Sequence, residues 1–265
     1  MYATVLNLPV YVLLPTFIIF FNLVCIGLLL IVRKYHLKLS SDSKSGFFHE
    51  NFSSAINMIF AFTISLVTIS AWQSHSAISD SVGKEATALM NIYRTLEAYP
   101  PEIRDQGRQL LKDFVNELVV NEWPAMADGQ ASMKAYKTLL NFANLVQRYK
   151  PKDYAELAAQ QEELRLLSTY RELRGYRVSN AKLIVDNTLL LVLGLAAMIY
   201  LLYQSLYDSE RLRPHLVMYT GLTTSIGLVF FLILSINHPF AGSGAVGPEP
   251  LEMLLTHFWP ISDLM

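Results

Sequence analysis

The chain has 265 residues, of which 52% are hydrophobic and 16% are charged, and its formal net charge is −1. This balance excludes a nucleic-acid-binding protein, because displacing counterions from phosphates requires an excess of Lys and Arg. A chain this apolar is instead typical of integral membrane proteins.

Four apolar stretches with almost no charge divide the chain. Each has roughly the 20 residues that an α-helix needs to cross a hydrocarbon core. They cover residues 9–32, 52–74, 183–203 and 216–237. We therefore predict an all-α integral membrane protein with four transmembrane helices.

Basic residues mark the two short loops between these spans. They are Arg33, Lys34, Lys38 and Lys44 after the first span, and Arg211 and Arg213 before the fourth. Lys and Arg near span ends stay in the cytoplasm. The first eight residues and everything after Asn237 contain neither residue. We predict that both loops are cytoplasmic, and that both termini and residues 76–182 are periplasmic in a bacterial inner membrane.

The second span carries small and polar residues along one face. At about 100° per residue, six residues fall on one narrow stripe, which we call the polar stripe. These are Ser54, Asn57, Ala61, Ser65, Thr68 and Trp72. Such a stripe can line a water-filled pore, or it can pack against another helix, because small and hydroxylated residues let membrane helices approach closely. The sequence leaves both interpretations open.

Residues 76–182 are predicted to form an extramembrane helical bundle. Its strong helix breakers are Pro100–Pro101, Trp123–Pro124 followed by Asp128–Gly129, and Pro151, which separate pieces of helical length. Pro101 suits the first turn of a helix, where a missing N–H costs nothing. Residues 76–182 contain near-equal numbers of basic and acidic residues, which indicates an ordinary solvated surface.

Both central spans are expected to continue into this bundle. Residues 153–203 contain no proline, so we predict one long helix that enters the third span. The helix of the second span is likewise predicted to continue to about residue 98.

Three arginines at three-residue spacing precede the third span: Arg171, Arg174 and Arg177. In a symmetric ring of subunits, these residues would form a positive vestibule that concentrates anions. A solvated face whose arginines pair with neighbouring acids, such as Glu172, explains them equally well.

Asp186 is the one acid within an apolar stretch, three residues into the third predicted span. An intramembrane carboxylate is a candidate ion site. Its place near the end of the span favours instead an interfacial residue that water or lipid headgroups solvate. In the fourth span, Thr223 and Gly227 form a small-xxx-small pair that favours close helix packing.

Residues 238–265 form a tail rich in Gly and Pro at its start. Three glycines and three prolines between Pro239 and Pro250 exclude a regular helix or a central strand there. Such a path requires anchors, and Phe240, Val246 and Leu251 are the apolar side chains available. We divide the chain into residues 1–75, 76–182, 183–237 and 238–265, with the tail packed on the helical domain.

Two motifs give this chain a family resemblance. One is the tail string in which Asn237 precedes Pro239, Phe240, Gly242, Val246, Pro248, Glu249 and Pro250, and the other contains Trp123 and Pro124. Together with the order of spans, they resemble the bestrophin-like domain family over nearly the whole chain. True bestrophins are pentameric anion channels, so the resemblance implies a homo-oligomer, a pentamer, whose polar stripe lines the pore. Residues 241–247 lack the acids that bind calcium in bestrophins, so calcium gating is not expected.

No catalytic or metal-binding motif occurs in the sequence. It contains no Gly-rich phosphate loop, no paired cysteines and no His-Glu-x-x-His. We therefore expect no enzymatic activity, no cofactor and no metal. The leading hypothesis is an oligomeric channel-like pore that contacts the lipid bilayer and small inorganic ions, anions rather than cations, and no nucleic acid. The alternative is a non-conducting membrane scaffold or envelope sensor that acts through its extracytoplasmic helical domain.

Overall fold

The computed structural model describes residues 9–35, 46–206, 212–242 and 244–258. Within these ranges, every regular element is helical. Four helices are long and apolar enough to cross a membrane, so the prediction of an all-α protein with four transmembrane helices is confirmed. The elements are α2 (Val10–Lys34), α3 (Gly46–Thr95), η1 (Leu96–Ala98), α4 (Pro101–Glu117), η2 (Leu118–Glu122), α5 (Trp123–Met126), α6 (Met133–Arg148), α7 (Tyr154–Ser179), α8 (Asn187–Ser205), α9 (Leu212–Ile236), α10 (Glu249–Met253) and η3 (Leu254–Phe258).

The chain forms two compact units. The transmembrane unit contains Met1–Ser74 and Ile184–Asn237, and the helical domain contains His75–Leu183 and His238–Met265. Helix α3 contributes residues to both units.

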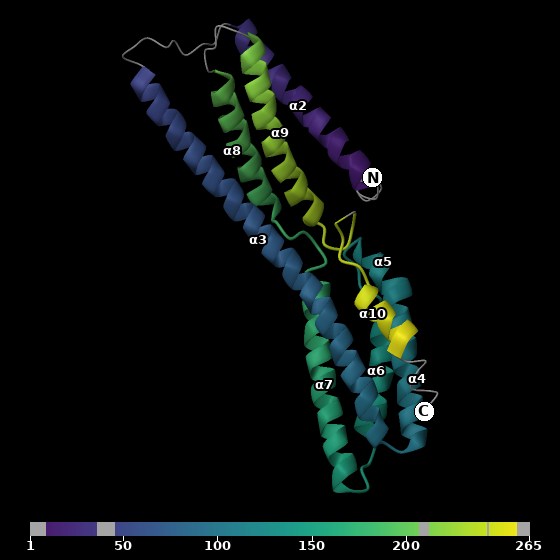
Figure 1. The fold of residues 1–265 in the computed structure, drawn as a ribbon. Helices are drawn as coiled ribbons and strands as arrows, with labels where there is room; N and C mark the ends of the chain where they lie inside the picture. The colour runs from purple at the N-terminus through teal and green to yellow at the C-terminus, as the bar shows by residue number, and fades with distance from the viewer. Residues whose placement is uncertain (1–8, 36–45, 207–211, 243, 259–265) are drawn as a thin grey trace. The chain divides into compact units, whose positions relative to one another are not determined.

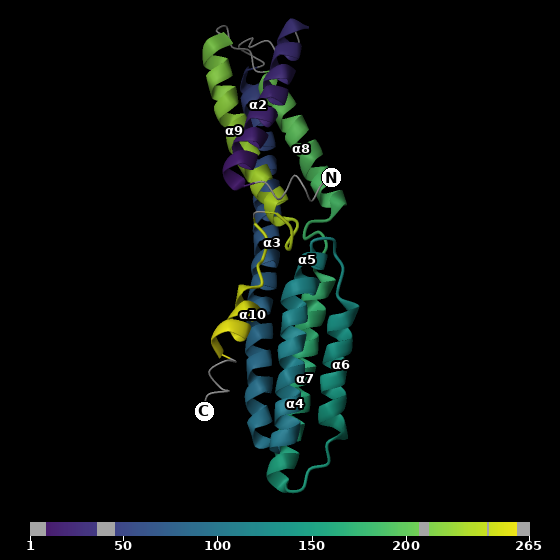
Figure 2. The same cartoon turned by 90° about the vertical axis from the view of Figure 1, so that its right-hand side faces the viewer.

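Helices α2 and α9 lie side by side in the transmembrane unit (Figures 1 and 2). Gly227 permits this approach, because a Cβ atom there would lie 3.1 Å from side-chain atoms of both Ile18 and Phe21. One helical turn earlier, Thr223 donates a hydrogen bond to Asn22 Oδ1 at 2.6 Å. The small face predicted for the fourth span therefore packs against the first span.

Helix α3 uses one face to join this unit. Phe60 and Val67 are buried on that face, and the Phe60 ring stacks on Tyr200 of α8 at 4.5 Å between ring centroids. Farther along, Ala71 shares a buried cluster with Leu193 of α8 and with side chains of α9. A single apolar face thus holds α3 against its neighbours.

The helical domain is built from α4, α6 and α7 together with the second half of α3. Helices α4 and α6 contact each other, as do α6 and α7 (Figure 2). Their facing side chains form an apolar core in which Phe114, Phe142 and Leu167 are almost fully buried. The proline-based prediction for α4 is confirmed, because Pro101 occupies its first turn.

The predicted continuous helix into the third span is wrong. Helix α7 ends at Ser179 and α8 begins at Asn187. Asn237 makes the interruption stable: its backbone oxygen accepts from Ile184 N at 3.0 Å, and its Oδ1 accepts from Val185 N at 2.6 Å. These long-range acceptors replace the helical carbonyls that the N–H groups would otherwise use. The helix of the second span does continue, through α3 and η1 to Ala98.

Of the break predicted at Trp123–Pro124 and the following Asp128–Gly129, the structure has the part at Asp128–Gly129 and not the part at Trp123–Pro124. The chain passes from α4 through the π-helical turn η2 into α5. Pro124 is tolerated because it lies in the first turn of α5, directly after the widened π turn. The helix ends a few residues later, where Gly129 adopts a φ of 69°.

Candidate pore face and motif cluster

The polar stripe lies on the surface of the protomer. Its members Ser54, Asn57, Ala61, Ser65 and Trp72 are exposed, and Thr68 is half-buried. The buried face of α3 points elsewhere, toward α8 and α9. Five of the six stripe residues are thus exposed, outside the face by which α3 packs on α8 and α9.

The stripe is bordered by apolar surface. Met58, Phe62 and Leu66 of α3 are 76%, 66% and 52% exposed. Such side chains suit contact with lipid, whereas Ser and Asn side chains do not. The exposed surface of this span is therefore polar along the stripe and apolar beside it.

A side chain of another helix holds Asn57 in place. Gln204, in the last turn of α8, donates a hydrogen bond from Nε2 to Asn57 Oδ1 at 2.8 Å. Thr68 instead donates to the carbonyl of Ile64 on its own helix at 2.7 Å. Sequence reasoning missed Gln204, because its contact joins residues that are 147 positions apart.

The structure separates the three arginines that were predicted to form a vestibule. Arg171 is exposed and Arg174 is half-buried, but Arg177 is 0% exposed. The prediction is wrong for Arg177, which forms ion pairs in the interior of the helical domain and does not face solvent.

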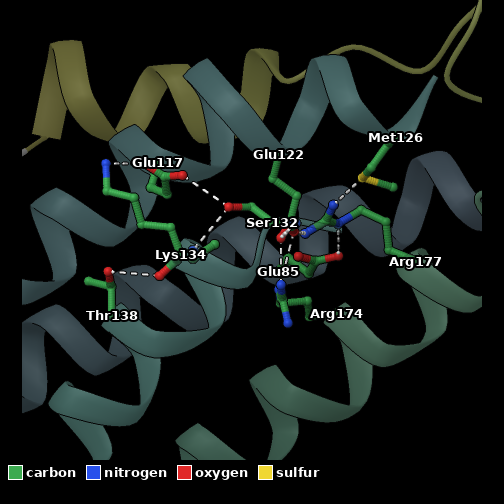
Figure 3. Close-up of polar contacts among 10 residues, drawn as sticks. Glu85, Glu117, Glu122, Met126, Ser132, Lys134, Thr138, Arg174 and Arg177 are labelled. Carbon is green, nitrogen blue, oxygen red and sulfur yellow. Dashed lines mark hydrogen bonds and ion pairs between the residues drawn. The ribbon is translucent and has the colours of Figure 1, made fainter. Parts of the chain in front are cut away.

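Arg177 connects three helical segments (Figure 3). Its Nε lies 2.7 Å from Oε1 of Glu85 in α3, and its Nη2 lies 3.0 Å from Oε1 of Glu122 in η2. Arg174 also pairs with Glu122, and all atoms of both acids are buried. Two arginines thus face two glutamates, so the buried charges balance.

Burial sets the electrostatics of this network. Desolvation raises the pKa of Glu85, and the positive charge of Arg177 opposes that rise. For Arg177, desolvation is the largest single effect and lowers the pKa, but the charge and hydrogen bond of Glu85 act together with the charges of Tyr170 and Glu122, and the pKa is raised. Arg177 therefore keeps its charge at any physiological pH.

Glu122 and Glu117 also fix the start of α6. Ser132 N donates to Glu122 Oε2 at 3.1 Å, and the Ser132 hydroxyl donates to Glu117 Oε1 at 3.0 Å. The same hydroxyl oxygen accepts from Ala135 N, so Ser132 is the N-cap of α6. A hydrogen bond from Lys134 is the main reason that the pKa of Glu117 is lowered. These contacts are structural.

A further acid is buried elsewhere in the helical domain. Glu163 of α7 is 0% exposed, and neither of its carboxyl oxygens has a hydrogen-bond partner among the described residues. Desolvation, and then the charge of Glu162, raises the pKa of Glu163 to about 8. This carboxyl is therefore mostly protonated at neutral pH.

Asp186 does not lie inside the third span. It precedes α8 as its exposed N-cap, and its Oδ1 accepts from Thr188 N at 3.3 Å. The prediction that the chain is already helical there is wrong, and capping is a sufficient reason for an acid at this position.

The two sequence motifs meet in the helical domain. Trp123 Nε1 donates to the carbonyl of Val246 at 3.1 Å, and the Trp123 ring packs edge-to-face on Phe240 with 5.5 Å between centroids. The guanidinium of Arg177 lies over the Trp123 ring, 4.9 Å from the ring centroid. We call Trp123, Phe240, Val246 and Arg177 the motif cluster.

The remaining motif residues shape the tail around this cluster. Pro239 accepts from Val246 N at 2.7 Å, and Gly242 adopts a φ of 88°, which closes the loop between them. Pro248 is the N-cap of α10, whose first turn contains Glu249 and Pro250. Phe240, Val246 and Leu251 are 6%, 7% and 0% exposed, so the predicted anchors are confirmed.

Metal-binding chemistry has no support in these contacts. Among the residues that the structure describes, no group of three or more His, Cys, Asp and Glu side chains could hold an ion. The features with functional potential are therefore the exposed polar stripe and the motif cluster.

The bestrophin-like domain matches residues 19–251, which include the polar stripe and both motifs. The chain belongs to the bestrophin-like family. The resemblance inferred from the Trp-Pro and Pro-Phe motifs is thus confirmed. No curated protein and no solved structure matches the chain. The motif cluster gives the family's two motifs a common structural role, because their residues contact one another across more than 100 positions.

Proposed function

We propose that this bestrophin-like protein is an oligomeric channel-like pore whose α3 helices line the conduction path, with anions favoured over cations. The polar stripe is the observation that carries the proposal. It contains Asn, Ser and Thr side chains within a span, and five of its six residues are exposed on the protomer.

Membrane energetics require a partner for this stripe. Polar side chains that face hydrocarbon are unfavourable, and they are normally turned toward a protein interior or a water-filled cavity. In a ring of protomers the stripes would face a common axis, while Met58, Phe62 and Leu66 would contact lipid or neighbouring subunits. Family membership supports this arrangement, and a pentamer is the number that the family resemblance implies.

The charge pattern supports anions. The stripe contains no Asp or Glu, so no acidic ring would attract cations. Arg171 is exposed and remains available to an anion-attracting vestibule. Arg177 is excluded from that role by its burial, and the charge of Arg174 is taken up by Glu122.

The proposed orientation depends on basic residues near the span ends. Arg33 and Lys34 lie in the last turn of α2, and Arg213 lies in the first turn of α9. Lys38, Lys44 and Arg211, which belong to the same argument, lie outside the described residues. We propose a bacterial inner membrane with both termini and the helical domain in the periplasm.

A non-conducting scaffold or envelope sensor is the second candidate. The helical domain exposes the large apolar side chains Val120, Met133 and Tyr136, which are 56%, 67% and 48% exposed. Apolar side chains of this kind favour contact with another protein. In that case the stripe would pack against stripes of other subunits without a water-filled path.

Planar-bilayer recording with a chloride gradient tests the pore. We expect discrete currents from the wild type that reverse near the chloride potential. Asn57→Trp and Ser65→Trp should abolish them, because the added ring would occupy the path. The matched controls Met58→Trp and Leu66→Trp place the same ring on the next residue, outside the stripe, and should conduct.

Cysteine labelling separates the two candidates. Cys25 is the only cysteine and is buried, so a new cysteine can be followed without background. In a pore, Ser65→Cys should react with a charged, water-soluble thiol reagent and Leu66→Cys should not. If wild-type oligomers are silent and Ser65→Cys is unreactive, the scaffold or sensor is the correct function.

A further inference from the structure

The hydrogen bond between Gln204 and Asn57 makes the donor and acceptor groups of the Asn57 amide unequally available to an outside partner. A carboxamide has one oxygen that accepts and one NH₂ group that donates. In Asn57 the oxygen is already engaged by Gln204 Nε2 at 2.8 Å. This bond uses one of the two acceptor positions of the oxygen, whereas no described residue accepts from the Asn57 NH₂ group, so on the exposed stripe the NH₂ group has the larger capacity left for an outside partner.

We propose that Asn57 is the anion-selecting residue of the pore and that Gln204 is its positioning residue. This inference rests on the proposed function and names the group that distinguishes anions from cations. An N–H donor stabilises an anion, whereas an amide oxygen stabilises a cation. Gln204 therefore decides which of the two ions Asn57 favours.

Four of the other stripe residues do not make this distinction. Ser54, Ser65 and Thr68 have hydroxyl groups, which both donate and accept, and Ala61 has no polar side-chain atom. Trp72 has an indole N–H, which donates and cannot accept, so it serves as the comparison in the test.

A ring of neutral donors also suits conduction. In an oligomer each subunit would contribute one Asn57 amide at the same depth. Donors without a full charge bind a passing anion weakly enough to release it, which conduction requires. The position of Gln204 in the last turn of α8 ties the amide to a helix rather than to a loop, so its orientation is fixed.

The test is the ratio of chloride to sodium permeability, obtained from reversal potentials in planar bilayers. Gln204→Met removes the hydrogen bond without adding charge. It should lower the ratio about fivefold, the factor that one net hydrogen bond supplies. Gln204→Glu can only accept, so Asn57 should turn its oxygen toward the path, and the ratio should fall further, about tenfold or more.

A double variant separates positioning from a general structural effect. In an Asn57→Ala background, Gln204→Met should change the ratio no further, because the residue that it orients is gone. Trp72→Phe, which removes the other N–H donor, should leave the ratio near that of the wild type. Unfolding temperatures of all variants should stay within a few degrees of one another.

The outcomes distinguish this inference from the proposed function. A wild-type protein without current overturns both. A conducting wild type whose permeability ratio does not change in Gln204→Met and Gln204→Glu overturns the inference alone. An equal effect of Gln204→Met with and without Asn57, or loss of selectivity in Trp72→Phe, also overturns it.

Discussion

The two units of this protein handle polar groups in opposite ways. The helical domain buries full charges completely and pairs them, with Arg177 between Glu85 and Glu122. The transmembrane unit has neutral polar contacts, such as that of Asn22 with Thr223, and leaves most of the polar stripe exposed. Buried charges need their partners, because removing one partner destabilises the domain, whereas polar groups left exposed in a membrane span require a partner from outside the protomer. Function is therefore expected along the stripe rather than at the domain's arginines.

The largest expected effect comes from breaking the buried charge network. Arg177→Ala should lower the free energy of unfolding by about 3–5 kcal/mol, because it leaves Glu85 and Glu122 buried without this partner. It also removes the cation above the Trp123 ring. Chemical unfolding of the purified protein in detergent, followed by circular dichroism, measures the change.

Arg171→Ala is the matched control for this substitution. Arg171 lies on the same helix but is exposed, so its removal should cost less than about 0.5 kcal/mol. If both substitutions cost the same, the buried pairs contribute nothing and the contrast between the two units disappears.

Glu163 gives the helical domain a dependence on pH. Its pKa is raised from 4.5 to about 8, so the folded state retains a proton that the unfolded chain releases. The stability of the domain should therefore fall as the pH rises from about 4.5 to about 8, and the loss is on the order of 5 kcal/mol.

The variant Glu163→Gln removes this titration. Its stability should vary less across the same pH range, and at pH 8 and above it should exceed that of the wild type. The comparison comes from unfolding measured at several pH values between about 5 and about 9, the range over which Glu163 titrates. Parallel pH curves for wild type and variant would show that Glu163 does not titrate there.

The smallest expected effect lies in the transmembrane unit. Thr223→Val removes the hydrogen bond to Asn22 but keeps the shape of the side chain. It should cost about 0.6 kcal/mol and at most about 1.7 kcal/mol, the range measured for such bonds between membrane helices. Unfolding in mixed micelles that contain sodium dodecyl sulfate is a suitable assay.

Thr16→Val is the isosteric control in the same unit. Thr16 donates only to the carbonyl of Val12 in its own helix, so its loss breaks no contact between helices. A cost for Thr223→Val as large as that for Arg177→Ala would contradict the comparison between the two units.

The sequence was sufficient for the spans, the α4 start and the tail anchors, because each depends on local composition. Hydrophobic length predicted the four spans, and Pro101 predicted a helix start. The anchors Phe240 and Val246 followed from being the apolar side chains in an irregular segment. Such features need no knowledge of distant residues.

Two of the errors involve contacts between distant positions. The break before α8 depends on Asn237, and the burial of Arg177 depends on Glu85, 92 residues away. The spacing of the three arginines gave no sign that one of them faces inward. Likewise, an Asn in a polar stripe does not reveal that Gln204 orients it.

Asn237 also has a mechanical consequence. Its backbone oxygen and its side chain bind the segment that leads into α8 to the end of α9. The third and fourth spans are therefore joined at this end, so a rotation of one helix would be transmitted to the other. Any movement that reaches α8 would then carry Gln204 with it. Through Gln204 the movement would change the orientation of the Asn57 amide.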